Sequence, residues 1–177
     1  DSMNFKFNLK DLDISTDRSF SNEKKDKNKY ITLHYDEKWS NKTYISKYVD
    51  IEPSKEQLLS LINNIRYKSN DQIIITTGVN TPEILKNTIS EINNQNIKLI
   101  ESLNFKELEK IVSRSKLLIS CHGAISHVAS AYNIRQIDII DNNSKEPYSN
   151  WTDHFRNYFP IYRKKFSTLS EEITKLL

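Results

Sequence analysis

Short apolar segments alternate with longer amphipathic segments from residue 30 to the end of the chain. The alternation predicts five strands: YITLHY from Tyr30, QIIITTG from Gln72, IKLIES from Ile97, KLLIS from Lys116 and IRQIDII from Ile134. The second of these is apolar and β-branched at its centre, as is typical of a strand covered on both faces. A strand followed by a helix, repeated in this way, predicts an α/β fold, a Rossmann-like parallel sheet with helices on both faces.

The amphipathic segments carry start signals for helices. A hydroxyl or amide side chain at the N-cap accepts a hydrogen bond from the first turn, and a Glu or Gln three residues later completes a capping box. We predict helices at about 55–68, from residue 82, after residue 104, over the alanine-rich segment after Gly123, and at about 170–177. The predicted N-caps are Ser54 with Gln57, Thr81 with Pro82 at the first helical position, Asn104 with Glu107, and Ser170 before Glu171 and Glu172.

The first part of the chain has a different composition. Residues 1–29 are polar and highly charged, and their run NEKKDKNK has no apolar residue to bury. Such segments cannot offset the entropy of folding with apolar burial. We therefore expect a linker or N-terminal arm over residues 1–29 and one Rossmann-like domain over residues 30–177.

Composition narrows the class of protein. At 177 residues and 20.8 kDa, with 37% apolar residues, the chain can build a full core without disulfide or metal. It has no apolar run near the ~20 residues that cross a bilayer. A single cysteine, Cys121, excludes an internal disulfide and favours a reducing, cytoplasmic setting. The net charge of +3 gives no general argument for nucleic acid, so an anionic ligand would need a local site.

The chain has only two glycines, Gly78 and Gly123, and both follow predicted strands. Ligands of open α/β sheets bind along the carboxyl edge of the strands, where a glycine allows a sharp turn and a close approach to main-chain N–H groups. Residues Gly123, Ala124, Ile125 and Ser126 would then form a helix N-terminus suited to a phosphate. The alternative is that glycine only allows close packing of strand and helix.

Two histidines flank this turn. His122 precedes Gly123, and His127 follows it by four residues, which places it on the same face of a helix. Near a helix N-terminus an imidazole is neutral and can donate a hydrogen bond to a phosphate or a sugar. The alternative for His127 is a partly buried ring that donates to a carbonyl. Cys121, His122 and His127 lack the paired spacing of zinc ligands, so we expect no metal.

The segment from Ile100 to Ile140 resembles the carboxyl-terminal half of the heptosyltransferase-like glycosyltransferases, family 9, which have the GT-B fold. The resemblance rests on the Ser102-Leu103 step into a helix, on Gly123 and His127 at the turn, and on the alanine-rich helix and apolar strand that follow. Further upstream, Lys38 and Trp39 match a Lys and a Trp that approach the nucleotide, and Gly78 with Glu83 matches a glycine and an acidic loop.

The match has two departures. Cys121 and His122 stand where the family has an acidic residue and a hydroxyl, and one extra residue separates Gly123 from His127. The family's amino-terminal domain, which binds the acceptor, would need more than a hundred further residues. The resemblance therefore implies a donor-binding domain that needs a missing N-terminal acceptor domain and is inactive alone.

The resemblance also implies a reaction. It is an inverting transfer from a nucleotide-diphosphate sugar to a glycan or lipid-linked acceptor such as lipopolysaccharide, at the cytoplasmic side of the inner membrane with only peripheral membrane contact. Lys38 and His127 would be catalytic. The donor-binding residues would be Trp39, Gly78, Glu83, His122, Gly123, Ala124, Ile125 and Ser126. No cofactor and no metal would be needed beside the donor substrate.

Other interpretations remain open at this point. A Rossmann-like domain can be a non-catalytic nucleotide-binding or interaction module. Lys38 could lie in a solvated turn, and Trp39 could pack over the sheet. The aromatic and basic segment from Tyr148 to Phe166 could bind nucleic acid or a membrane, but we expect it to cap the end of the sheet with a solvated basic edge, and we expect no nucleic-acid partner.

Overall fold

The fold is built on one parallel sheet. The computed structural model describes residues 30–39, 52–92, 94–141 and 145–177. The sheet has six strands in the order β3-β2-β1-β4-β5-β6, and every neighbouring pair is parallel. The strands are β1 Tyr30–His34, β2 Gln72–Thr76, β3 Ile97–Ile100, β4 Leu117–Cys121, β5 Arg135–Ile140 and β6 Tyr158–Tyr162. The expected Rossmann-like fold is confirmed.

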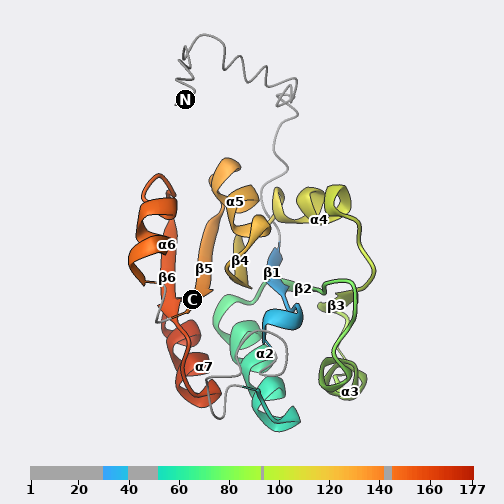
Figure 1. Cartoon of the computed structure of the whole chain (residues 1–177). Coiled ribbons are helices and arrows are strands. Elements are labelled where there is room, and N and C mark those ends of the chain that lie inside the picture. The colour runs from blue at the N-terminus through green and yellow to red at the C-terminus, as the bar shows by residue number, and fades with distance from the viewer. Residues whose placement is uncertain (1–29, 40–51, 93, 142–144) are drawn as a thin grey trace, which may run out of the picture.

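Helices cover both faces of the sheet. They are α2 Lys55–Ser69, α3 Glu83–Glu91, α4 Phe105–Val112, α5 Ala124–Ala131, α6 Lys145–Thr152 and α7 Phe166–Lys175, with a short 3-10 helix η1 Glu37–Trp39 after β1. Figure 1 shows α2, α3 and α7 together on one side of the sheet and α4 and α5 on the other. The chain therefore crosses from one face to the other after β3, between the two halves of the sheet.

Strand periodicity separates the core into two layers. In β4, Leu117 and Ile119 pack against α2 and α7, whereas Leu118 packs under α4 and α5. Successive side chains of a strand point to opposite faces, so a strand covered on both sides must be apolar throughout. This explains the continuous apolar segments of the sequence. The polar exceptions within these strands are therefore informative.

Two of the predicted caps are confirmed. Ser54 and Asn104 cap α2 and α4, each within a capping box closed by Gln57 or Glu107. The cap at Thr81 is wrong, because α3 begins at Glu83 with Pro82 as its N-cap. The Thr81 hydroxyl lies instead 3.1 Å from the Thr77 hydroxyl, across the loop after β2.

The carboxyl-terminal segment differs more from expectation. The last helix, α7, begins at Phe166 rather than near Ser170, because Phe166 and Leu169 are buried against the sheet and its first turn is needed to place them. The aromatic segment before it contains an unpredicted strand, β6, which pairs with β5 at the edge of the sheet formed by the described residues. Pro160 is tolerated there because an edge strand has one side without ladder bonds. Arg163, expected on a solvated edge, is 6% exposed. The arm expected over residues 1–29 lies outside the described residues.

Candidate functional site

The strand order places a switch point between β1 and β4. The chain leaves β1 toward α2 on one face and leaves β4 toward α5 on the other. Loops that diverge in this way leave a crevice at the carboxyl edge of the two strands, which is where ligands of open α/β sheets bind. Two sequence-predicted residues, Lys38 after β1 and Gly123 after β4, lie on either side of this point.

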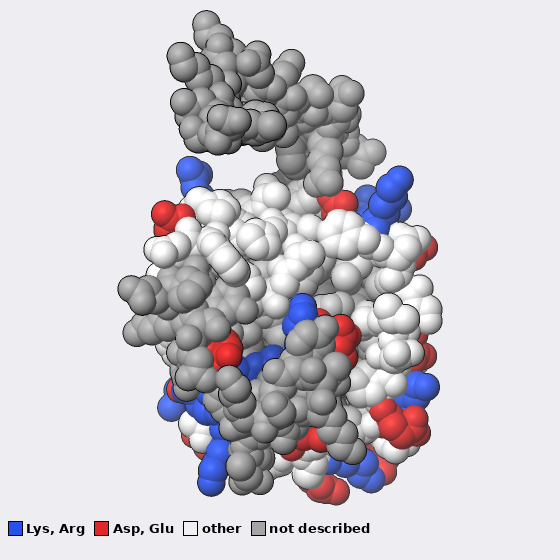
Figure 2. Space-filling model, viewed as in Figure 1, with Lys and Arg blue, Asp and Glu red and all other residues white. Residues whose placement is uncertain are grey.

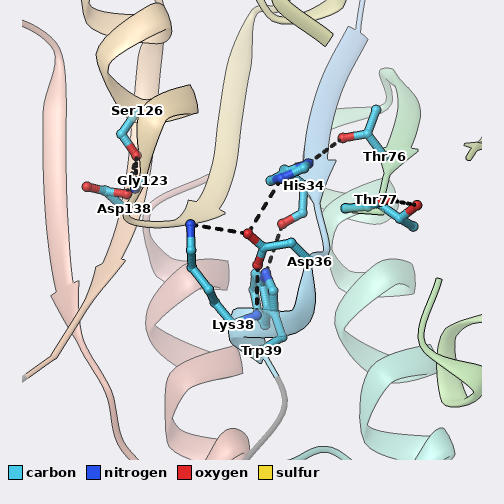
Figure 3. A network of polar contacts seen from close by, with 10 residues as sticks. His34, Asp36, Lys38, Trp39, Thr76, Thr77, Gly123, Ser126 and Asp138 are labelled. Atoms are coloured by element: carbon cyan, nitrogen blue, oxygen red, sulfur yellow. Dashed lines mark hydrogen bonds and ion pairs between the residues drawn. The ribbon is translucent and has the colours of Figure 1, made fainter. Parts of the chain in front are cut away.

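A buried carboxylate organises the β1 side. Asp36 Oδ1 accepts the Lys38 backbone N–H at 3.1 Å, and Asp36 Oδ2 lies 3.4 Å from Lys38 Nζ and 3.6 Å from His34 Nε2. Figure 3 shows the lysine side chain rising from η1 toward Gly123. The Lys38 side chain is 28% exposed, whereas Asp36 is buried. The turn after β1 therefore holds one accessible cation in a defined position.

His34 lies beneath this group. Its Nδ1 is 2.9 Å from the Thr76 hydroxyl on β2. Burial lowers the pKa of His34, and the nearby Asp36 charge only partly opposes that effect. His34 is thus neutral near pH 7, so the charge of Asp36 is balanced mainly by Lys38.

Trp39 has a structural position. Its ring is 1% exposed, stacks on Tyr35 at a centroid distance of 5.1 Å, and donates from Nε1 to the His34 carbonyl at 2.8 Å. It offers no open ring face to a nucleotide in this structure. This burial favours the alternative that Trp39 packs against the sheet, and its role in donor binding stays a prediction.

Gly123 provides space for Lys38. A Cβ atom built on Gly123 would collide with Lys38 Nζ. The backbone of Gly123 is extended, with φ 176°, so no left-handed turn requires glycine here. The bend between β4 and α5 therefore needs no left-handed residue, and what glycine supplies at this position is a close approach of the lysine ammonium to the start of α5.

The first turn of α5 is held by its own polar groups. The Gly123 N–H donates to Ser126 Oγ at 3.3 Å, and the Ser126 N–H donates to the Gly123 carbonyl at 3.0 Å. The N–H groups of Ala124 and Ile125 lie at the helix end, where an α-helix has no intrahelical acceptor for them. A helix N-terminus with a lysine ammonium beside it is a suitable arrangement for an anion.

Asp138 is the residue that the sequence interpretation missed. It lies on β5, has no exposed surface, and is contacted by three side chains. Ser126 Oγ donates to its Oδ1 at 2.8 Å, while His122 Nδ1 at 2.5 Å and Tyr158 OH at 3.0 Å meet its Oδ2. The available signal was one acid inside the apolar segment IRQIDII. The family that the sequence resembles has an acidic residue at the position of Cys121. In this structure a buried acid lies instead on the neighbouring strand, β5.

The two histidines of the turn are placed differently. The side chain of His122 is 8% exposed and is held by Asp138, whereas His127 is exposed on α5. Their ring centroids are 5.6 Å apart, and the His127 ring also meets Phe155 at 5.0 Å. Desolvation lowers the pKa of His127, and the charges of His122 and His154 add to this. His127 is therefore a neutral donor near pH 7.

Gly78 and Glu83 follow β2 rather than β4. A Cβ built on Gly78 would lie 2.5 Å from Glu37 Oε2 and 3.5 Å from Asp36 Cβ, so Gly78 packs against the turn after β1. Glu83 is exposed in the first turn of α3. Their roles in donor binding stay predictions.

Three other features were considered in the described residues: a cysteine nucleophile, a metal site and a membrane-spanning helix. Cys121 is buried, and burial raises the pKa of its thiol, which disfavours the nucleophilic thiolate. Within residues 30–39, 52–92, 94–141 and 145–177, no three His, Cys, Asp or Glu side chains are grouped so that they could hold a metal ion. In the same ranges no helix is both long enough and apolar enough to span a membrane.

Comparison with known proteins identifies the fold. No protein-family model and no curated protein matches the sequence. Among solved structures, the chain is similar to Escherichia coli heptosyltransferase WaaC with ADP, with a TM-score of 0.59 and 13% identity over 85% of this chain and 44% of that one. It is also similar to Methanocaldococcus jannaschii UDP-GlcNAc 2-epimerase with UDP-GlcNAc and UDP, with a TM-score of 0.55 and 16% identity over 84% and 38%.

A third similar structure is a putative UDP-N-acetylglucosamine 2-epimerase from Listeria monocytogenes, with a TM-score of 0.57 and 14% identity over 87% of this chain and 38% of that one. The chain spans less than half the length of these proteins. At such low identity the likeness shows the fold alone. The chain has the α/β fold found in one part of GT-B enzymes.

Proposed function

We propose that this chain is the donor-binding domain of a GT-B glycosyltransferase that uses a nucleotide-diphosphate sugar. The observation that carries the proposal is the position of Lys38 Nζ directly over Gly123, beside the first N–H groups of α5. A lysine and a helix N-terminus meet there at the switch point of the sheet, where a diphosphate would receive both a cation and main-chain donors.

The chemistry of transfer explains why such a site would catalyse. When the sugar leaves, negative charge grows on the diphosphate, and donors aimed at that charge stabilise the transition state. Lys38 would offset the charge, and the N–H groups of Ala124 and Ile125 would bind the phosphate oxygens. The neutral, exposed His127 would donate to a phosphate or a sugar hydroxyl. The general base is not assigned to any residue of this chain.

The charged groups near the switch point, rather than the net charge of the protein, support a site for an anionic donor. Figure 2 shows an uncharged area over α5, which has no Lys, Arg, Asp or Glu, with acidic and basic side chains around it. The net charge of +3 is spread among 26 basic and 23 acidic residues. An anionic ligand would therefore be attracted by the few groups at the switch point.

Two of these similar structures were solved with nucleotides, one with ADP and one with UDP-GlcNAc and UDP, which supports a nucleotide ligand. Because the chain spans less than half of them, the proposal includes a second domain that binds the acceptor. Transfer to a surface glycan of lipopolysaccharide type and a cytoplasmic location near the inner membrane are further parts of the proposal.

A thermal-shift series tests the proposal. The ligands are UDP-GlcNAc, ADP-glucose and GDP-mannose, with a CMP-sugar as the matched control that has only one phosphate. A ligand at one hundred times its Kd stabilises the folded state by about 2.7 kcal/mol. For a domain of this size that raises Tm by roughly 5 to 10 °C.

We expect at least one diphosphate sugar to give this shift and the CMP-sugar to give less. A protein that responds to no diphosphate sugar, or equally to the CMP-sugar, would not have the proposed diphosphate site. A shift by free diphosphates with no discrimination among sugars would favour a non-catalytic nucleotide-binding module.

A further inference from the structure

A series of polar contacts leads from β2 to the Lys38 ammonium. The Thr76 hydroxyl lies 2.9 Å from His34 Nδ1 on the neighbouring strand. The other ring nitrogen, His34 Nε2, lies 3.6 Å from Asp36 Oδ2, and the same oxygen lies 3.4 Å from Lys38 Nζ. Figure 3 shows these four side chains one after another, from Thr76 to the lysine that points toward Gly123. The lysine therefore shares its carboxylate with a buried imidazole.

This series is fixed at the strand end and accessible at the lysine end. Thr76 and His34 are register partners in the sheet, and the Tyr35 N–H donates to the Thr76 carbonyl at 2.8 Å. Trp39 Nε1 donates to the His34 carbonyl at 2.8 Å. Thr76 has no exposed surface and His34 is 6% exposed, whereas the Lys38 side chain is 28% exposed. The ammonium is thus the member that can turn to a ligand.

The contacts of His34 select one tautomer of its ring. Burial lowers the pKa of His34, so the ring is neutral near pH 7 and carries a single N–H. An N–H on Nδ1 would leave the lone pair of Nε2 facing the Asp36 carboxylate, and two acceptors repel one another. An N–H on Nε2 faces that carboxylate instead, and Nδ1 then accepts from the Thr76 hydroxyl. In this tautomer each ring nitrogen faces a partner of the opposite kind.

Asp36 therefore has donors other than the lysine ammonium. Its Oδ1 accepts the Lys38 backbone N–H at 3.1 Å, and its Oδ2 faces the N–H of His34. A buried carboxylate without donors is costly, so these two N–H groups matter most when the ammonium leaves. They allow Asp36 to stay buried and charged while Lys38 contacts a ligand.

Arg163, the buried arginine after β6, acts on a different part of the molecule. It is 6% exposed, and its charge acts on Tyr35 and Cys121, which belong to the core covered by α2 and α7. The cationic side chain in contact with Asp36 is that of Lys38. The balance at this carboxylate is therefore between one ammonium and one neutral imidazole.

We infer that Thr76 is a positioning residue that keeps the Lys38 ammonium available to the diphosphate. By donating to Nδ1, its hydroxyl holds the His34 N–H toward Asp36, and that N–H stabilises the carboxylate when the lysine turns to the ligand. Without the hydroxyl, Asp36 depends on the ammonium, and the lysine is released less readily. The inference rests on the proposed function, since it concerns the lysine of the same site.

The central variant is Thr76→Val, which keeps the shape of threonine and removes the hydroxyl. We expect its affinity for a diphosphate sugar such as UDP-GlcNAc or ADP-glucose to fall about two- to tenfold, the range of a neutral hydrogen bond. Affinity for the corresponding nucleoside monophosphate should change much less, because the lysine is assigned to the diphosphate. Thr76→Ser restores the hydroxyl and should bind as wild type does. Isothermal titration at pH 8, where His34 is neutral, measures these affinities.

The matched control is Thr32→Val. Thr32 is also a threonine of this sheet with no exposed surface, two residues before His34 on β1, and its hydroxyl lies 2.6 Å from Ser115 Oγ. Ser115 keeps its own bond to the Ile111 carbonyl at 3.0 Å when that hydroxyl is removed. Thr32→Val should therefore leave both affinities unchanged. Urea unfolding shows that each variant is folded.

A double-mutant cycle with Lys38→Ala shows whether Thr76 acts through the lysine. Two residues that act through one interaction have non-additive effects. Thr76→Val should therefore weaken diphosphate binding in the wild-type background and have no further effect in the Lys38→Ala background. A loss of the same size in both backgrounds would overturn the inference.

Nuclear magnetic resonance tests the tautomer in the protein without ligand. Long-range proton–nitrogen correlation spectra at pH 8 distinguish a protonated ring nitrogen from an unprotonated one, and the His34 signals are those absent from His34→Asn. We expect the proton on Nε2 in wild type and in Thr76→Ser. A proton on Nδ1 would overturn the inference even if Thr76→Val does not fold.

The outcomes separate this inference from the proposed function. If wild type binds with the expected tautomer, and Thr76→Val alone of the threonine variants loses diphosphate affinity, the positioning role is established. If wild type binds but Thr76→Val loses nothing, loses diphosphate and monophosphate affinity equally, or loses no more than Thr32→Val, the hydroxyl has a structural role only and the donor-binding function stands. If wild type binds no diphosphate sugar, the donor-binding function fails, and the positioning role fails with it whatever the tautomer.

Discussion

The two sides of the switch point use the same chemical groups for different purposes. On the β1 side, Asp36 lies between a neutral His34 and Lys38, and the lysine remains 28% exposed. On the β4 and β5 side, Asp138 lies between His122 and Ser126 with no exposed surface. The first side presents a cation to the crevice, whereas the second holds an anion beneath it. Burial and partners decide the role of each carboxylate.

The two sides also differ in how they are assembled. The groups of the β1 side lie within a few residues of one another, and the turn at Asp36 is closed by its own backbone and side chain. The groups of the other side come from the end of β4, from α5, from β5 and from β6. The first side depends on local sequence, and the second on strand register.

The largest effect that this comparison predicts is at Lys38. Lys38→Ala removes the cation of the β1 side, and a hydrogen bond to a charged group is worth about 1.5 to 3 kcal/mol. We expect affinity for a diphosphate sugar to fall about 10- to 100-fold, and affinity for a nucleoside monophosphate to change much less. Isothermal titration of both ligands measures the difference.

The matched control is Lys116→Ala. Lys116 is also a lysine paired with an aspartate, Asp71, but it lies just before β4 at the opposite end of that strand. Its removal should leave both affinities unchanged. Equal losses for diphosphate and monophosphate ligands in Lys38→Ala would remove the lysine from the phosphate site.

The sequence predicts the local features of the molecule well, and it predicts poorly the features that depend on strand register. The sheet was predictable because each buried strand must be apolar on both faces, and the capping boxes at Ser54 and Asn104 were predictable because they are local. Lys38 and Gly123 could be proposed as one site only through a resemblance. Their contact requires β1 and β4 to be neighbours, and residue 34 is far from residue 117 in sequence.

Asp138 escaped prediction for the same physical reason. In sequence it is one acid in an apolar strand, and its partners lie 12 to 20 residues away. Only the register of β4 with β5, which pairs Ser120 with Asp138, brings it under the turn. Trp39 is the reverse case, because a resemblance suggested a role for it in advance. A resemblance suggested contact with the nucleotide, whereas the packing of η1 buries the ring.

The second-largest expected effect is at Gly123, where the β1 side meets the β4 and β5 side. Gly123→Ala would put a methyl group where Lys38 Nζ lies, and the flexible lysine would move away. Because φ at Gly123 is extended, alanine fits the backbone, and the free energy of unfolding should change by less than about 1 kcal/mol. Diphosphate affinity should fall about two- to fivefold, in the range of an exposed ion pair.

Gly78→Ala is the control for this prediction. Its methyl group would meet Glu37 Oε2 of the turn after β1, again at the end of a flexible side chain. Affinity should not fall, because the displaced group is an acid. Similar losses in the two glycine variants would mean that the loops respond as a whole and that Lys38 has no special relation to Gly123.

The smallest effect is on stability, and it tests the neutral state of His34. Burial lowers the pKa of His34 below the ordinary value of about 6.5, so the unfolded chain binds this proton at higher pH than the folded one does. The stability that depends on neutral His34 is fully present above about pH 6.5. It is lost as pH falls toward the lower pKa of His34 in the folded protein, and the free energy of unfolding changes by no more than about 1.4 kcal/mol per pH unit. His34→Asn, whose amide can keep the bond to Thr76, should reduce this slope in urea unfolding between pH 6.5 and 5, whereas His154→Asn, at a largely exposed ring, should retain it. A full slope in His34→Asn would show that burial does not hold the His34 imidazole neutral.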